Sequence, residues 1–308
     1  MGVTPRAVAS LVIAAACWGL GTVVAKRAVT EFAPIALLAV QLAASLAVLL
    51  VLMRWRSVPL RDPAAPPILL RLGLLNPGIA YALSLVGLVS ITASLSVLLW
   101  ALEPIVILLL ATIFLGERIG PLGLTLSGLA IAGIWLIAGN PDGEAAAVGV
   151  GLTIAGVVCC AVYTIATRRW IGASDSTAQV VLGQQAHALG LALVLAVAAS
   201  ILIGGVLPAG ATAVGWLSAI GSGLLYYAAA YWFYLSGLRD VPASIAAATF
   251  YLIPAFGVAG GLILLGESLD PRQWLGVVVV AAAITGLFWQ TLGRERRVPR
   301  PAVGQVRA

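Results

Sequence analysis

The feature that most constrains this chain is a series of long apolar stretches that carry almost no charge. A helix needs about 20 mostly apolar residues to cross the hydrocarbon core of a bilayer. Ten such stretches follow one another, at roughly 6–29, 34–53, 67–89, 92–114, 121–139, 148–170, 178–203, 213–237, 241–265 and 271–292. Their apolar runs are continuous rather than alternating, which excludes the strands of a transmembrane barrel. We therefore expect an all-α polytopic membrane protein with ten transmembrane helices.

Composition and charge agree with this class. Hydrophobic residues make up 62% of the 308 residues and charged residues only 9%, whereas about 25% of a typical soluble domain is charged. The net charge of +6 reflects an uneven distribution of basic residues among the loops, not a surface for binding nucleic acid. With the N-terminus inside, 14 of the 17 Lys and Arg residues lie on the cytoplasmic side: Arg6, Arg54, Arg56, Arg61, Arg71, Arg118, Arg168, Arg169, Arg239, Arg294, Arg296, Arg297, Arg300 and Arg307. Because basic loops stay inside, we expect a plasma (inner) membrane protein with both termini cytoplasmic.

The chain also contains an internal repeat. A shift of 150 residues aligns 66–121 with 216–271 without a gap, and it pairs Tyr81 with Tyr231 and Pro104 with Pro254. We therefore expect two five-helix units, at 1–139 and 148–292, followed by a basic cytoplasmic tail at 293–308. Five is odd, so the second unit must be inverted relative to the first, as in many secondary transporters. The alternative is a repeat that serves assembly only.

Several motifs resemble a known family. They are Trp18-Gly19 with Lys26 and Pro34, then Ala93-Ser94…Pro104…Leu115-Gly116-Glu117, and Ala243-Ser244…Pro254…Leu265-Gly266-Glu267. In this order they resemble the EamA-like branch of the drug/metabolite transporter superfamily, over residues 8–290. The resemblance implies ten helices around a central cavity and export or exchange of small metabolites, often amino acids. Gln41 departs from the family, which commonly has an arginine there, so no fixed positive charge for a substrate carboxylate is implied.

Glu103 is the principal candidate for a functional residue, because a carboxylate near a bilayer centre costs roughly 2.5 kcal/mol or more. On a continuous helix, Ser96, Trp100 and Glu103 stand at i, i+4 and i+7 and share one face, which we expect to line a cavity. Glu103 is then a proton carrier or a partner for a cationic amine. The alternative is a protonated side chain that bonds a carbonyl freed by Pro104.

Further candidates for the cavity are aromatic or polar. They are Tyr81, Tyr227 and Tyr231, with Trp18, Gln41, Gln184 and His187. Aromatic walls suit amino acids or cationic organic molecules, although a tyrosine stripe also packs well in an ordinary core. Pro104 and Pro254 are candidate hinges or static kinks. Glu117 and Glu267 are expected to hold the turns into the following helices, and a lone histidine excludes a multi-histidine metal site.

These features favour a secondary transporter that exports small metabolites such as amino acids by alternating access. Its expected partners are a small-molecule substrate, the lipid bilayer and protons, with a monomer or homodimer as its assembly and no cofactor. No phosphate-binding loop of the form G-x-x-x-x-G-K-[ST] is present, which argues against ATP hydrolysis. The alternatives are an intramembrane enzyme acting on lipid, for which the acid–base residues are few, and a channel or receptor.

Overall fold

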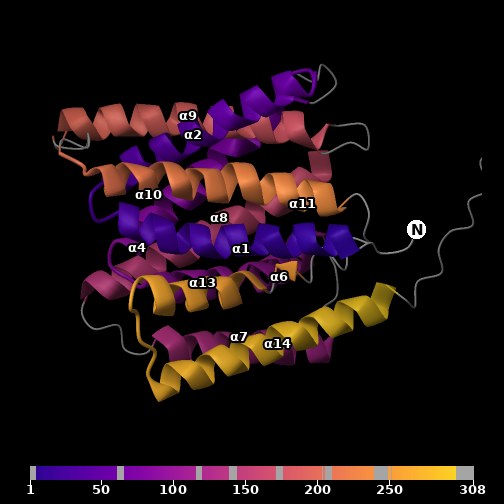
Figure 1. Cartoon of the computed structure of the whole chain (residues 1–308). Helices are drawn as coiled ribbons and strands as arrows, with labels where there is room; N and C mark the ends of the chain where they lie inside the picture. The colour runs from indigo at the N-terminus through magenta and orange to yellow at the C-terminus, as the bar shows by residue number, and fades with distance from the viewer. Residues whose placement is uncertain are drawn as a thin grey trace, which may run out of the picture.

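The computed structural model describes residues 5–60, 66–115, 120–138, 144–170, 176–202, 204, 210–238, 249–250 and 252–295, and all regular elements in these ranges are helical (Figure 1). The elements of the first part of the chain are α1 (Pro5–Ala28), α2 (Pro34–Trp55), α3 (Pro67–Arg71), η1 (Leu72–Leu74), η2 (Leu75–Ile79), α4 (Ala80–Leu88), α5 (Ala93–Trp100), α6 (Glu103–Leu115) and α7 (Pro121–Ala138). Those of the second are α8 (Glu144–Trp170), α9 (Thr177–Leu202), α10 (Ala213–Gly223), η3 (Leu224–Ala229), α11 (Ala230–Leu238), α13 (Leu252–Leu264) and α14 (Pro271–Glu295).

Six helical stretches of the described chain are long and apolar enough to cross a membrane: Pro5–Ala28, Pro34–Trp55, Pro67–Leu88, Glu144–Thr167, Ala178–Leu202 and Ala213–Tyr234. Shorter apolar helices cover Ala93–Ile107, Pro121–Ile137 and Leu252–Leu264. Each of the ten expected stretches contains helix, although 241–265 lies within the described residues only from α13 and Thr249–Phe250. The chain is therefore an all-helical, multi-pass membrane protein.

The third stretch, expected as one helix, is bent near its middle. Between α3 and α4 the chain passes through the 3₁₀ turn η1 and the π-helical segment η2. Asn76 has the extended angles φ −143° and ψ 120° inside this segment, and the Asn76–Pro77 peptide bond is cis. A second π-helical segment, η3, joins α10 to α11 at the place 150 residues later.

The fourth stretch, also expected as one helix at 92–114, is divided into α5 and α6. Pro104 has no N–H to donate to the carbonyl of Trp100, so the regular ladder cannot pass this point. The Ala101 N–H is shared between the carbonyls of Val97 and Leu98, each 3.2 Å away. The fourth stretch is therefore not one regular helix: Ser96 and Trp100 lie on α5, whereas Glu103 begins α6.

The helices lie roughly side by side, with α7 and α14 paired along one edge of the bundle and α2 and α9 along the opposite edge (Figure 1). Segments far apart in the sequence interleave between these edges. Helix α1 packs against α10, α11 and α13, and helix α8 packs against α4, α5 and α6. The largest buried cluster lies among α1, α2, α4, α9 and η3, and includes Leu37, Leu42, Leu85 and Tyr227.

Two close crossings fix α2 and α9 in this arrangement. Gly73 lies against the backbone of Gln184 on α9 so closely that no side chain fits there. Gly223 stands in the same relation to Gln41 on α2, where an added Cβ would lie 2.5 Å from the Gln41 carbonyl oxygen. Glycine is required at both crossings because two backbones meet directly.

The two ends of the bundle differ. The N-terminal end of α1 and the C-terminal end of α14 lie at one end (Figure 1). At the other, called the far end below, lie the connections 29–33, 89–92, 210–212 and 265–270, which side-chain contacts tie together.

Candidate functional site

Glu103 occupies the first turn of α6 and is bonded by side chains of α8. The Cys160 thiol donates to Glu103 Oε1 at 3.3 Å, and the Thr164 hydroxyl lies close to the same carboxyl group. Among the described residues, the one ion pair joins Arg27 and Glu31. No described basic side chain therefore forms an ion pair with Glu103. The site thus holds a carboxyl group with neutral donors.

Two groups of aromatic rings lie near this carboxyl group. In the first, Tyr81 on α4 contacts Trp100 on α5, with ring centroids 5.3 Å apart, and also Tyr226 and Tyr227 of η3, at 5.5 and 5.2 Å. Tyr231 on α11 lies within electrostatic range of both Tyr81 and Glu103. The structure therefore brings Trp100, Tyr81, Tyr227 and Tyr231 into the neighbourhood of Glu103.

The second aromatic group is centred on Trp18 of α1. Its ring lies 5.6 Å from Tyr231, 5.8 Å from Tyr234 and 5.3 Å from Phe250. Tyr231 belongs to this group and is also the link to Glu103. Trp18 is therefore packed among aromatic rings of α11 and Phe250.

The two candidate glutamines bind different partners. Gln41 Nε2 donates to Ser222 Oγ at 2.8 Å, whereas Gln184 Nε2 donates to the Leu69 carbonyl at 2.9 Å and its oxygen accepts from the Tyr163 hydroxyl at 2.7 Å. Gln41 Oε1 and the Tyr227 hydroxyl are buried and have no hydrogen-bond partner within the described residues. Buried polar atoms are normally satisfied, so these two are available to water or to a ligand.

Some polar residues near the site were not predicted. Cys160 and Thr164 stand four apart on one face of α8, a spacing that could have identified a polar face. Gln185 follows Gln184 directly; it accepts from Ser45 Oγ at 2.8 Å and donates to the Tyr227 carbonyl at 3.1 Å. Cysteine and threonine in an apolar stretch resemble ordinary core-packing residues, so the sequence did not single out the α8 pair.

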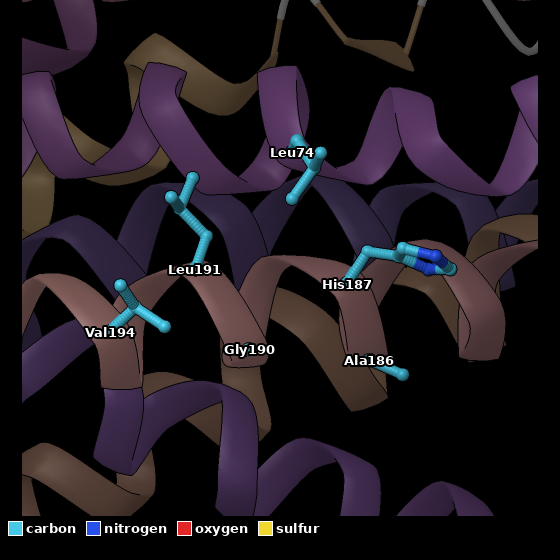
Figure 2. A pocket seen from close by; sticks show the side chains of 6 residues that line it. All are labelled: Leu74, Ala186, His187, Gly190, Leu191 and Val194. Atoms are coloured by element: carbon cyan, nitrogen blue, oxygen red, sulfur yellow. The ribbon is translucent and has the colours of Figure 1, made fainter.

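His187 is not brought together with Glu103. It is exposed on the outside of α9, beside an apolar hollow lined by Leu74, Gly190, Leu191 and Val194 (Figure 2). Figure 2 shows Leu74 and Leu191 pointing into the space between their two segments. His187 Nδ1 lies 2.8 Å from the Gly183 carbonyl oxygen of its own helix, a local contact.

The remaining candidates lie at helix ends. Pro104 is the second residue of α6 and Pro254 the third of α13, so both stand in the first turn of a helix, where proline is tolerated. The Glu267 carboxylate bonds the first residues of α5, accepting from Ala93 N at 2.6 Å and Ser94 N at 2.9 Å. Glu117 lies outside the described residues.

Comparisons with known proteins agree with this architecture. The model of the EamA-like transporter family matches the chain twice, over residues 5–139 and 147–289. A curated relative from Streptantibioticus cattleyicolor, named a probable terminal-alkyne amino-acid exporter, is 27% identical over 228 residues, which are 70% of each chain. A solved crystal structure shares the fold, with a TM-score of 0.66 and 18% identity over 95% of this chain and 99% of that one. Because the family model covers nearly the whole sequence, the chain belongs to the EamA-like transporter family.

Proposed function

We propose that this transporter exports small metabolites that carry an amine, such as amino acids, by alternating access between two inverted five-helix halves at 1–139 and 148–292. Membership of the EamA-like family supports a transporter. The relative named as an amino-acid exporter supports the substrate class and the direction. The two separate matches of the family model support the division into halves.

Reciprocal contacts support the inverted arrangement. In the proposed repeat, α8 corresponds to α1, α11 to α4, and α13 to α6. Helix α1 packs against α11 and α13, and helix α8 packs in turn against α4 and α6. The crossings of Gly73 with Gln184 and of Gly223 with Gln41 form a second reciprocal pair. Reciprocal packing of equivalent helices is expected when two similar halves are related by an axis in the membrane plane.

The observation that carries the proposal is Glu103, a carboxyl group that is bonded by the neutral Cys160 thiol and lies close to Tyr231. A substrate ammonium group would pair with this carboxylate, and the faces of Tyr81 and Trp100 would add cation–π attraction. The unpartnered Gln41 Oε1 and Tyr227 hydroxyl offer hydrogen bonds to the rest of the substrate. Competition between a proton and the ammonium group for Glu103 would couple export to proton entry.

Orientation follows the distribution of basic residues. Arg54 and Arg56 lie where α2 ends, and Arg169 lies where α8 ends, away from the far end. We place this basic end and both termini in the cytoplasm and the far end outside the plasma (inner) membrane.

The test is transport by purified protein in liposomes with an imposed pH gradient. Glu103→Gln removes the titratable group and keeps its shape, so uptake driven by the proton gradient should fall to the level of empty liposomes. Glu144→Gln, at the exposed start of α8, is the matched control and should transport normally. Undiminished proton-driven flux in Glu103→Gln would refute the role of this residue. Mass spectrometry of the transported compound checks that it is unchanged, since an enzyme would return a different molecule.

A further inference from the structure

The turn between α4 and α5 is held from both sides by charged residues of other segments. Lys26 of α1 donates through Nζ to the carbonyls of Leu88 and Val89, at 2.7 and 3.2 Å, where α4 ends. Glu267 accepts from Ala93 N, Ser94 N and Ser94 Oγ, at 2.6, 2.9 and 2.5 Å, where α5 begins. A cation at a helix C-terminus and an anion at an N-terminus both match the helix dipole.

Glu267 completes the start of α5. The first N–H groups of a helix have no acceptor within it. The Thr92 hydroxyl accepts from Leu95 N at 3.1 Å, and Glu267 accepts from the two N–H groups before it. Residue 267 belongs to the α13–α14 connection, 173 residues from Ser94. The bonds therefore fasten α5 to a distant segment and not to its own neighbours in sequence.

Helix α5 links this contact to the candidate site. It is only eight residues long, from Ala93 to Trp100. Its first residues are held by Glu267, and its last residue, Trp100, packs on Tyr81 beside the site. The break at Ala101–Leu102 separates it from α6 and Glu103. A displacement of the first residues of α5 would therefore be carried along the short helix to Trp100.

We propose that Glu267, Ser94 and Lys26 form a latch that closes the far end, and that release of α5 from Glu267 opens it. The inference rests on the proposed alternating-access function, for which one side of the substrate site must open at a time. Glu267 and Lys26 are only partly buried, so water can replace their bonds once the segments part. The latch sets the balance between the closed and open far end, and α5 transmits that balance to Trp100.

The test measures opening directly and does not depend on transport. Cys17, Cys159 and Cys160 are free thiols and are first replaced. Spin labels are then attached through Ser90→Cys on the α4–α5 turn and Ser268→Cys on the α13–α14 connection, both exposed positions. In lipid nanodiscs, Glu267→Gln should raise the ratio of long to short distances about tenfold, the lower end of the effect expected when a charge-assisted hydrogen bond is lost.

Glu31→Gln is the matched control, because Glu31 holds a helix start at the same end by the same kind of bonds. It should leave the distances unchanged. Lys26→Gln is a second variant of the latch and should shift them in the same direction as Glu267→Gln. Unchanged distances in both latch variants, in protein that elutes as a single folded species, would overturn the latch. If the distances shift but the protein with its native cysteines carries no substrate, the latch stands and the transport proposal fails.

Discussion

Two acidic residues at the far end hold the start of a helix in nearly the same way. Glu267 accepts from the N–H and hydroxyl of Ser94, and Glu31 accepts from the N–H and hydroxyl of Thr212, at 2.8 Å each. The difference is in the helix that is held. Helix α5 ends after eight residues at a break, whereas α10 continues through η3 into α11. We therefore expect the same capping chemistry to act as a latch on the short helix α5 and as a simple anchor on the long segment formed by α10, η3 and α11.

The surroundings of the two carboxylates also differ. Glu31 forms an ion pair with Arg27 of its own segment, at 2.6 Å. Glu267 has no such pair among the described residues, and the nearby Lys26 is bonded to carbonyls of α4. Glu31 can thus keep a charge partner if α10 moves away, whereas Glu267 has only α5 to bond.

The largest difference should follow from truncating each acid to alanine. Glu267→Ala leaves the first N–H groups of α5 without a protein acceptor, and losing a helix cap costs about 1–2 kcal/mol of stability. Glu31→Ala should lower stability less, because Glu31 accepts from one backbone N–H group, that of Thr212, whereas Glu267 accepts from two. The midpoints of thermal unfolding of both variants in the same detergent show which substitution lowers stability more. Equal or reversed losses would contradict the distinction between latch and anchor.

A smaller effect is expected from Lys26→Met, which keeps the apolar stem and removes the charge. The carbonyls of Leu88 and Val89 lose a donor, which typically costs about 1 kcal/mol. The midpoint of thermal unfolding should fall by less than in Glu267→Ala. Arg272→Met, on an exposed residue of the same end, serves as the control. A loss as large as that in Glu267→Ala would mean that Lys26 is the principal element of the latch.

The smallest effect should appear in the acid dependence of stability. Hydrogen bonds from the hydroxyl and N–H of Thr212, followed by the Arg27 side chain, hold the pKa of Glu31 below its usual value. A lowered pKa stabilises the folded state above the unfolded value of about 4.3, and this contribution is lost as the pH falls through the folded pKa. The free energy of unfolding should therefore fall slightly more in the native protein than in Glu31→Gln when the pH is lowered from 6 into the acid range. Parallel curves would show that the Thr212 contact adds nothing.

The positions of the long helices were predictable, because they follow the long apolar stretches of the sequence. The first was expected at 6–29 and is found at Pro5–Ala28, and the last was expected at 271–292 and is found at Pro271–Glu295. The break before Glu103 was missed because periodicity assumes an unbroken helix, although Pro104 marks a helix start as readily as a kink. Trp100 and Glu103 therefore share a region but not a continuous helical face.

The contacts of the site were less predictable. Glu267 was expected to hold its own turn, and its carboxylate instead bonds α5, a contact that only the packing of distant segments creates. Cys160 and Thr164 became visible as partners of Glu103 once α6 and α8 were placed together. Sequence spacing describes one helix at a time, and this site is assembled from several.

The position of α1 has a consequence for biosynthesis. Its partners α10, α11 and α13 are all made after residue 212. During synthesis, α1 must therefore wait in the bilayer, with Trp18 and Thr22 lacking their tyrosine partners on α11 and η3, until most of the chain has been inserted. An N-terminal fragment ending at Ala138 would lack these partners entirely. The two parts of this chain are thus expected to mature together, and each supplies the surface on which the other completes its assembly.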